Sequence, residues 1–229
     1  MNTNIDMPFK ILFVTATSSE GDTLKKIRKI FAVPEMLGKF EIIPLVTGVG
    51  AISTLWTMKQ WIMDNGKPDL AINAGIAGSY SDKFPKGDVV MPVTDCFADM
   101  GIEDGGSFLT LFEAGLMGED EFPFKNGFLY ADNEYTDKIK TFLKPVRAIT
   151  VNSATGSETT RGKLLEKFNP DIETMEGATF FYLCSREKIP FLALRAISNM
   201  VEQRNKNNWD IDLALNNLSE KIIAVLLTL

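Results

Sequence analysis

Short apolar runs alternate with segments of helical spacing along most of this chain. The runs 9–17 (FKILFVTAT) and 189–199 (IPFLALRAISN) are rich in β-forming residues and indicate buried strands. Segment 51–66 (AISTLWTMKQWIMDNG) spaces its apolar residues at helical intervals and ends at a glycine, a helix stop signal. The alternation predicts an α/β fold, with a mostly parallel central sheet flanked by helices on both faces.

The same reading accounts for most of the remaining chain. The other expected strands, several running into glycine turns, lie at 39–50, 68–79, 87–95, 146–157 and the start of 171–188. The other expected helices lie at 23–31, 158–168, the later part of 171–188, and 209–229. No Pro/Gly/Ser-rich linker or internal repeat interrupts the pattern, so we expect residues 1–229 to form a single domain.

Residues 99–130 do not follow the pattern. The stretches DMGIEDGGSF and FKNGF within this segment are glycine-rich and weakly periodic. Unstructured connections of this length inside a compact domain are usually functional or disordered. We therefore expect a long insertion or loop at 99–130.

Charge and composition exclude several classes of function. The net charge of −6 and the pI near 4.9 argue against a general nucleic-acid binder, which needs a basic surface. No apolar run is long enough to span a bilayer, and the start MNTNIDMPFK lacks the order of a secretory signal. We therefore expect a cytoplasmic protein without membrane or nucleic-acid partners.

The chain contains no histidine, which excludes Ser-His-Asp and Cys-His mechanisms and the common histidine-based metal sites. Acid–base chemistry must then come mainly from carboxylates, lysine, tyrosine or cysteine. The two cysteines, Cys96 and Cys184, lie far apart and do not suggest a disulfide framework. We expect Cys184 to pack in the core, and we expect neither a metal nor a cofactor.

Several turns follow expected strands and are expected to meet at one place. In open α/β sheets, ligands bind beyond the carboxyl ends of the strands. The turns in question are SSEGD, GVG, GIAGS, NSATGS, TMEG and ISN. One pocket could collect them all.

Three of these segments carry a family resemblance. In this order and spacing, NAGIAGS, ETMEGAT and LRAISN resemble the nucleoside phosphorylase family, nearest to its methylthioadenosine/S-adenosylhomocysteine nucleosidases, and the resemblance covers essentially the whole chain. The segments DCFADMGIEDGGSFLTLFEAGL and RAISNMVEQRNKNNW look most like the futalosine hydrolase branch. That resemblance implies hydrolysis of futalosine to hypoxanthine and dehypoxanthine futalosine, in menaquinone biosynthesis. It also implies a homodimer or higher homo-oligomer, for which residues 96–108 are a candidate contact.

Asn199 is the candidate that selects the base. The adenine-releasing relatives have RAISD where this chain has RAISN, and their aspartate serves N7 and the 6-amino group of the purine. A 6-oxopurine has an acceptor at O6 and, once protonated, a donor at N7. An asparagine side chain has one donor nitrogen and one acceptor oxygen, so it can meet both. The alternative is that Asn199 caps the following segment.

Glu20 and Glu176 are the candidate carboxylates. By resemblance, Glu20 activates water and Glu176 holds the ribose 2′- and 3′-hydroxyls, with Met175 beneath the ribose. A carboxylate can take a proton from water and favour the positive charge that develops on the sugar. The alternative for both glutamates is stabilisation of a helix start through the helix dipole, and for Met175 simple core filling.

Further candidates line the expected pocket. Ile76, Ala77 and Gly78 of the GIAGS turn supply small residues and backbone donors, Thr155 is a candidate for the purine edge, and Trp209 is a candidate for the 5′ end of the substrate. The alternative for Trp209 is that it anchors the C-terminal helix. Two departures from relatives stand out: Ile76 replaces a frequent serine, and Ser153 replaces the aromatic residue that stacks on the base. Arg204 is a candidate for the carboxylate of futalosine, with a solvated charge as its alternative.

The sequence leaves three rival functions open. A methylthioadenosine/S-adenosylhomocysteine nucleosidase is disfavoured by Asn199. An inosine or guanosine phosphorylase is disfavoured because the turn after the first strand lacks the glycine-rich or arginine-bearing phosphate site that phosphorylases of the resembled family commonly have. A non-catalytic nucleoside-binding protein would not need Glu20.

Overall fold

The computed structural model describes residues 8–25, 39–203 and 205–229. The predicted helix at 23–31 falls largely outside this part, since only its first three residues are described. The strands are β1 (Phe9–Thr15), β2 (Phe40–Val46), β3 (Leu70–Ser79), β4 (Val89–Asp95), β5 (Gly101–Asp104), β6 (Ser107–Thr110), β7 (Leu129–Tyr130), β8 (Lys144–Thr150), β9 (Ile172–Thr174) and β10 (Phe191–Met200). The helices are α1 (Ser18–Gly21), α3 (Ala51–Asn65), α4 (Glu134–Ile139), α5 (Glu158–Phe168), α6 (Gly177–Glu187) and α7 (Ile211–Thr228), with a 3₁₀ turn, η1 (Lys206–Asn208).

The main sheet has the order β10-β4-β8-β9-β3-β1-β2, and β10 also pairs with β3. This extra pairing closes β3, β10, β4, β8 and β9 into a ring, from which β1 and β2 extend as an open sheet. Most pairs are parallel, whereas β10–β4, β3–β9 and β4–β7 are antiparallel. The predicted fold class is confirmed. The sequence pattern did not indicate that five of the strands close into a ring.

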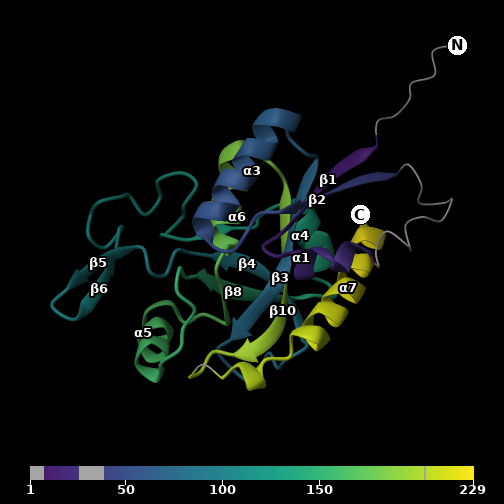
Figure 1. The fold of residues 1–229 in the computed structure, drawn as a ribbon. Helices are drawn as coiled ribbons and strands as arrows, with labels where there is room; N and C mark the ends of the chain where they lie inside the picture. The colour runs from purple at the N-terminus through teal and green to yellow at the C-terminus, as the bar shows by residue number, and fades with distance from the viewer. Residues whose placement is uncertain (1–7, 26–38, 204) are drawn as a thin grey trace, which may run out of the picture.

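Helices cover the sheet on both faces, α3 and α6 on one and α7 on the other (Figure 1). The sequence of strand β1 is continuously apolar because both of its faces are covered by helices. Ile11 and Phe13 belong to the core beneath α7, whereas Leu12 and Val14 belong to the core beneath α3 and α6. A strand that is buried on both faces has no polar face, so the usual alternation disappears.

Helix α7 is held by its apolar stripe. Leu218, Ile222, Val225 and Leu226 are fully buried against the sheet. Each such side chain contributes roughly 1.5–3 kcal/mol by leaving water. Asp210 caps the helix by accepting a hydrogen bond from Leu213 N at 3.1 Å, and its own N–H donates to Ser198 O at 2.8 Å. The helix start is thereby tied to the end of β10.

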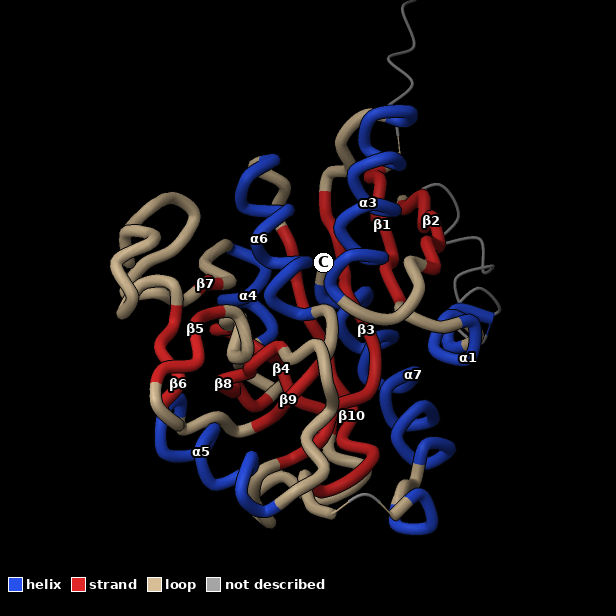
Figure 2. The backbone as a smooth tube through the Cα atoms, turned by 60° about the vertical axis from the view of Figure 1, so that its left-hand side comes forward, coloured by secondary structure: helices blue, strands red, loops and turns tan. Residues whose placement is uncertain are grey.

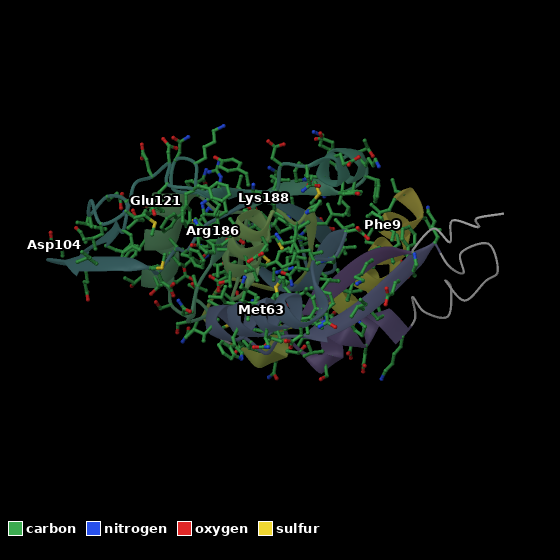
Figure 3. The ribbon with its side chains drawn as sticks, turned by 90° about the horizontal axis from the view of Figure 1, so that it is seen from above. Phe9, Met63, Asp104, Glu121, Arg186 and Lys188 are labelled. Carbon is green, nitrogen blue, oxygen red and sulfur yellow. The ribbon has the colours of Figure 1, made fainter. Side chains whose placement is uncertain are left out.

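Residues 99–130 contain regular structure that the weak periodicity did not indicate. Strands β5 and β6 form an antiparallel hairpin that projects from the body, with Asp104 at its tip (Figure 3). The hairpin lies beside α5 (Figure 2), where Lys167 Nζ donates to Phe108 O at 2.9 Å. Helix α4 follows this segment and was likewise not predicted.

The two cysteines are free and buried in different clusters. Cys184, on α6, packs in the core between the sheet, α3 and α6, as predicted, whereas Cys96 packs with Tyr80 and Phe168 near α5. Of the described helices, none is both long and apolar enough to cross a membrane.

Candidate functional site

A cavity of about 420 Å³ opens where the carboxyl ends of several strands meet. Its walls come from the residues that follow β1, β8 and β9, and from the ends of β3 and β10, which lie side by side (Figure 1). Nine of the residues singled out from the sequence line it: Glu20, Ile76, Ala77, Gly78, Thr155, Met175, Glu176, Asn199 and Trp209. The expectation of one shared pocket therefore agrees with the structure, whereas the role of each residue stays a prediction.

Glu20 lies in the short helix α1, which follows the carboxyl end of β1, and its side chain is buried. Its Oε2 accepts hydrogen bonds from Thr17 N at 2.9 Å, Ala16 N at 3.1 Å and Thr17 Oγ1 at 3.0 Å. Its Oε1 accepts from Ile76 N at 3.0 Å, across the cavity floor on β3. Thr17 and Glu20 form a capping box, so Glu20 also stabilises the helix start. Four donors thus hold one carboxylate at a fixed place in the cavity wall.

Glu176 is the N-cap residue of α6, yet its side chain makes no capping hydrogen bond. Its Oε1 instead accepts from Gly50 N at 2.8 Å, from the turn after β2. Burial raises the pKa of this carboxyl, the Gly50 N–H and Arg195 oppose the rise, and Glu20 adds to it. The side chain therefore faces the cavity and the turn after β2 rather than its own helix.

Asn199 lies at a β-bulge, because the pairing of β10 with β3 shifts register between Ile197 and Asn199. Its Nδ2 donates to Met200 O at 3.0 Å, and its Oδ1 accepts from Ser198 Oγ at 2.8 Å. It does not cap a helix. An amide has two N–H donors and a two-lone-pair oxygen, so one donor and one acceptor site remain for a ligand.

The other predicted residues surround these three. Ile76, Ala77 and Gly78 form one wall on β3, and Met175 follows β9. Trp209 lines the cavity just before Asp210, the N-cap of α7. Of the wall expected at 153–155, Ala154 and Thr155 line the cavity and Ser153 does not. Arg204 lies outside the described residues.

Glu173 is a cavity residue that the sequence reading missed. It is buried at 7% exposure, one residue before the end of β9. Its Oε1 accepts from Thr155 N at 2.9 Å, and its Oε2 accepts from Tyr80 Oη at 2.9 Å. Burial and the charge of Glu173 raise the pKa of Tyr80 well above its ordinary value, so the phenol stays a donor. An acidic residue inside a buried strand was the available signal.

Arg195 is a buried cation beneath the cavity, in the middle of the apolar strand β10. Its guanidinium donates to Asn73 O at 3.0 Å, to Leu194 O at 2.9 Å and to Asn73 Oδ1. Burial lowers its pKa, against the charges of Glu176, Glu20 and Asp95. A single cation thus offsets carboxylates that would otherwise repel one another.

Asp95, at the end of β4, is fully buried near the start of α6. Its Oδ1 accepts from Cys96 N at 2.8 Å and Thr150 Oγ1 at 3.0 Å, whereas its Oδ2 has no hydrogen-bond partner among the described residues. A Cβ added to Gly177 would lie 2.2 Å from that Oδ2, so only glycine fits there. Burial raises the pKa of Asp95 to about 7, against the hydrogen bond from Thr150 and the charge of Arg195.

This pKa predicts a specific pH dependence of stability. The ordinary aspartate pKa is about 3.9, so between about pH 4 and 7 the folded state holds a proton that the unfolded state has lost. The contribution of protonated Asp95 to the free energy of unfolding is complete below about pH 4 and is lost as pH rises through about 7. Urea unfolding of wild type and Asp95→Asn should therefore show the variant gaining roughly 3 kcal/mol relative to wild type between pH 5 and pH 8. A difference that is the same at both pH values would refute this assignment.

The chemical character of the cavity follows from its lining. Glu20, Glu173 and Glu176 supply carboxylates, and the remaining lining residues are mostly apolar or small. Neither lysine nor arginine lines the cavity within the described ranges, and no group of three or more Cys, Asp or Glu residues there could hold a metal ion. Such a site favours a neutral ligand with hydroxyl groups and a centre that becomes positive during reaction.

Comparisons with known proteins agree with this architecture. The chain is 29% identical over 184 residues to a futalosine hydrolase of Streptomyces coelicolor, covering 78% of this chain and 75% of the relative. It is 25% identical over 209 residues to a 5′-methylthioadenosine/S-adenosylhomocysteine nucleosidase of Buchnera aphidicola, covering 89% of this chain and 86% of that protein.

A solved structure shares the fold. The native futalosine hydrolase of Helicobacter pylori superposes with a TM-score of 0.79 at 18% identity, covering 97% of this chain and 99% of that one. Residues 13–229 match the phosphorylase superfamily. The match runs from within β1 to the end of the chain, and the chain therefore belongs to the phosphorylase superfamily.

Proposed function

We propose that this protein hydrolyses the N-glycosidic bond of a 6-oxopurine nucleoside, with futalosine as the substrate and hypoxanthine as the released base. The two curated relatives named above are both nucleosidases, which supports N-glycosyl hydrolysis. The observation that carries the choice of base is the Asn199 carboxamide in the cavity wall, with a free donor and a free acceptor site. A 6-oxopurine needs that combination at O6 and at N7–H.

The proposed reaction uses three side chains. Glu20 takes a proton from a water molecule whose oxygen bonds to C1′ of the sugar. The C1′–N9 bond breaks, its electron pair goes to the base, and a proton from solvent enters at N7. Glu176 accepts hydrogen bonds from the ribose hydroxyls, and Asn199 Oδ1 accepts from N7–H while Nδ2 donates to O6. Carboxylates near the sugar favour the positive charge that develops there.

Water is favoured over phosphate as the nucleophile. A phosphorylase must bind phosphate, which requires cationic side chains or clustered backbone donors. In the described part of the chain the cavity lining has carboxylates and no lysine or arginine. Among the described residues of the wall, no cation would offset the charge that Glu20 presents to a bound phosphate.

The second candidate is a methylthioadenosine/S-adenosylhomocysteine nucleosidase, which the relative from Buchnera aphidicola favours. One assay separates the candidates. The protein is incubated with futalosine, inosine and methylthioadenosine, each with and without phosphate, and the released base is identified. We expect hypoxanthine from futalosine without phosphate. Adenine release from methylthioadenosine at a comparable rate would overturn the choice of base, and a phosphate requirement would overturn hydrolysis.

Gly75 is expected to be essential for the position of the Glu20 carboxylate. A Cβ at residue 75 would lie 2.6 Å from Glu20 Oε1, closer than real contacts allow. Gly75→Ala should therefore displace the carboxylate and lower kcat by roughly 100-fold, while the chain stays folded. Gly162→Ala is the matched control, because nothing lies within 4 Å of its Cβ and it stands on the exposed face of α5. Steady-state kinetics on both variants, with thermal melting, test this; equal kcat values would contradict it.

We also propose a cytoplasmic homodimer that serves menaquinone biosynthesis. Helix α3 carries an exposed apolar face of Ile52 (84% exposed), Trp56 (71%) and Met63 (68%), the last of which is marked in Figure 3. Val49, 54% exposed beside this face, also lines the cavity. A second copy that covered α3 would therefore also narrow the cavity entrance. Sedimentation of the intact chain tests the dimer, and residues 96–108, which include β5 and the start of β6 of the projecting hairpin, are a second candidate contact.

A further inference from the structure

Helix α6 begins without a capping side chain of its own. Its N-cap residue, Glu176, makes no side-chain capping hydrogen bond, although an N-cap side chain ordinarily accepts from the second or third N–H of its helix. The first N–H groups of a helix have no partner within it, and leaving them unpaired is unfavourable where they are buried. Gly177 and Ala178, the first two residues of α6, are buried. Another part of the chain must therefore cap this helix.

Two threonine hydroxyls at strand ends take over the capping. Ala178 N donates to Thr150 Oγ1 at 2.7 Å, and Gly177 N donates to Thr174 Oγ1 at 3.1 Å. Thr150 is the last residue of β8 and Thr174 is the last residue of β9, and the two pair directly across these parallel strands. Their hydroxyl oxygens therefore lie side by side, 3.4 Å apart, against the start of α6.

Asp95 fixes the direction of these hydroxyls. Thr150 Oγ1 donates its one proton to Asp95 Oδ1 at 3.0 Å. Both lone pairs of the Thr150 hydroxyl therefore remain as acceptors, one for Ala178 N and one for the hydroxyl of Thr174. A chain of hydrogen bonds thus runs from the first N–H groups of α6 through two hydroxyls to one carboxyl group. Asp95 and Thr150 are almost fully buried, and neither of them lines the cavity.

We propose, on the basis of the function proposed above, that Thr150, oriented by Asp95, is a positioning residue that keeps the Glu176 carboxylate available to the ribose hydroxyls. Because Thr150 pairs with Ala178 N, the Glu176 side chain is not drawn back onto its own helix. It lines the cavity instead, and Gly50 N holds its Oε1 at 2.8 Å. Without the Thr150 hydroxyl the buried Ala178 N–H lacks an acceptor, and an N-cap side chain is the group that ordinarily takes that place. The ribose would then lose its partner.

The test is Thr150→Val, which keeps the shape of the side chain and removes its hydroxyl. The measured quantity is kcat/KM for futalosine divided by kcat/KM for its 2′-deoxy analogue, so that the intrinsic reactivities of the two sugars cancel when enzymes are compared. This ratio should fall by roughly tenfold or more, as expected when a hydrogen bond to a charged group is lost. A role confined to packing would lower both values alike, and an unchanged ratio would overturn the proposal.

Thr150→Ser is the matched control, because it removes the methyl group and keeps the hydroxyl. Its ratio should stay within about threefold of wild type, well below the effect of one lost hydrogen bond to a charged group. An equal or larger fall in Thr150→Ser would assign the effect to packing of the methyl group and overturn the proposal. Thermal melting shows whether each variant is folded. If Thr150→Val does not fold, Thr150→Ala removes the same hydroxyl without adding atoms and takes its place in the comparison.

Glu176→Ala separates this inference from the proposed function. We expect Glu176→Ala to lower the same ratio, and Thr150→Val added to it to lower the ratio no further, because both changes remove one interaction. An unchanged ratio in Glu176→Ala would refute the ribose role of Glu176, and the positioning by Thr150 with it. A ratio that falls in Glu176→Ala but not in Thr150→Val would refute only the positioning and leave the hydrolase standing.

Binding gives the same comparison if neither nucleoside is hydrolysed. Calorimetry on the intact chain then compares the dissociation constants of inosine and 2′-deoxyinosine. The preference for inosine should fall by roughly tenfold or more in Thr150→Val and be kept in Thr150→Ser. That result would support the role of Thr150 although the proposed reaction had failed. An equal preference in wild type and Thr150→Val, or binding of neither nucleoside, would overturn the positioning.

Discussion

Replacing Glu20 by glutamine should lower kcat for release of hypoxanthine by roughly 100- to 10,000-fold, the usual contribution of a positioned general base. The amide cannot take a proton from water, and it cannot favour the positive charge on the sugar. KM should change much less, because the ribose and base contacts assigned to Glu176 and Asn199 are kept. Steady-state kinetics with futalosine measure both constants.

The variant is expected to fold normally. Glutamine also completes a capping box, so the Thr17 N–H keeps an acceptor. Glu166→Gln is the matched control, since it removes the same charge from an exposed position on α5. If Glu20→Gln melted like wild type and kept its kcat within about fivefold, far above the loss of a general base, Glu20 would be a helix-capping residue and no more.

Changing Asn199 to aspartate should reverse the preference for the base. A carboxylate has no donor for O6 of hypoxanthine, whereas it accepts from the 6-amino group of adenine. We expect kcat/KM for futalosine to fall relative to methylthioadenosine by roughly 100-fold at least, and by up to about 10⁴-fold. The measurement is release of hypoxanthine and of adenine by the same enzyme preparation.

The substitution also has a structural cost. Asn199 Nδ2 donates to Met200 O at 3.0 Å, and a carboxylate oxygen would face that carbonyl instead. The expected loss is about 1–3 kcal/mol of unfolding free energy. Asn65→Asp is a matched control, because its Nδ2 likewise donates to a carbonyl, Trp61 O at 2.9 Å, on the surface of α3. A stable Asn199→Asp variant with unchanged base preference would remove the basis for a 6-oxopurine substrate.

Local patterns predicted most of the fold because the interactions behind them are local. The runs that became β1, β3 and β10 are buried on both faces and therefore appear as continuous apolar stretches. Helix α7 was predictable from its single apolar stripe. The hairpin at 101–110 was not, because its strands are short and largely exposed, so no burial pattern marks them.

Some residues of the candidate site could likewise be predicted from the sequence, and others could not. Glu20, Glu176 and Asn199 stand in or beside turns that follow apolar strands, where parallel sheets bind ligands, and the family resemblance then singled them out among the residues of those turns. Glu173 and Arg195 lie inside strands rather than in the turns that follow them, so the rule that ligands bind beyond strand ends did not select them. Their partners, Tyr80 and Thr155 for the glutamate and Asn73 for the arginine, are distant in the chain.

The sequence by itself determined which segments form strands and helices, and which polar residues stand at strand ends, since both depend on near neighbours along the chain. Only the tertiary structure decided that β3 pairs with both β9 and β10. That closure aligns Glu173, Gly78 and Asn199 in one row and buries Arg195 and Asp95 beneath the cavity. The physical reason is that side chains alternate between the two faces of a sheet along each strand. This alternation determines the face that a side chain occupies, but it does not determine which other strand pairs with its own strand.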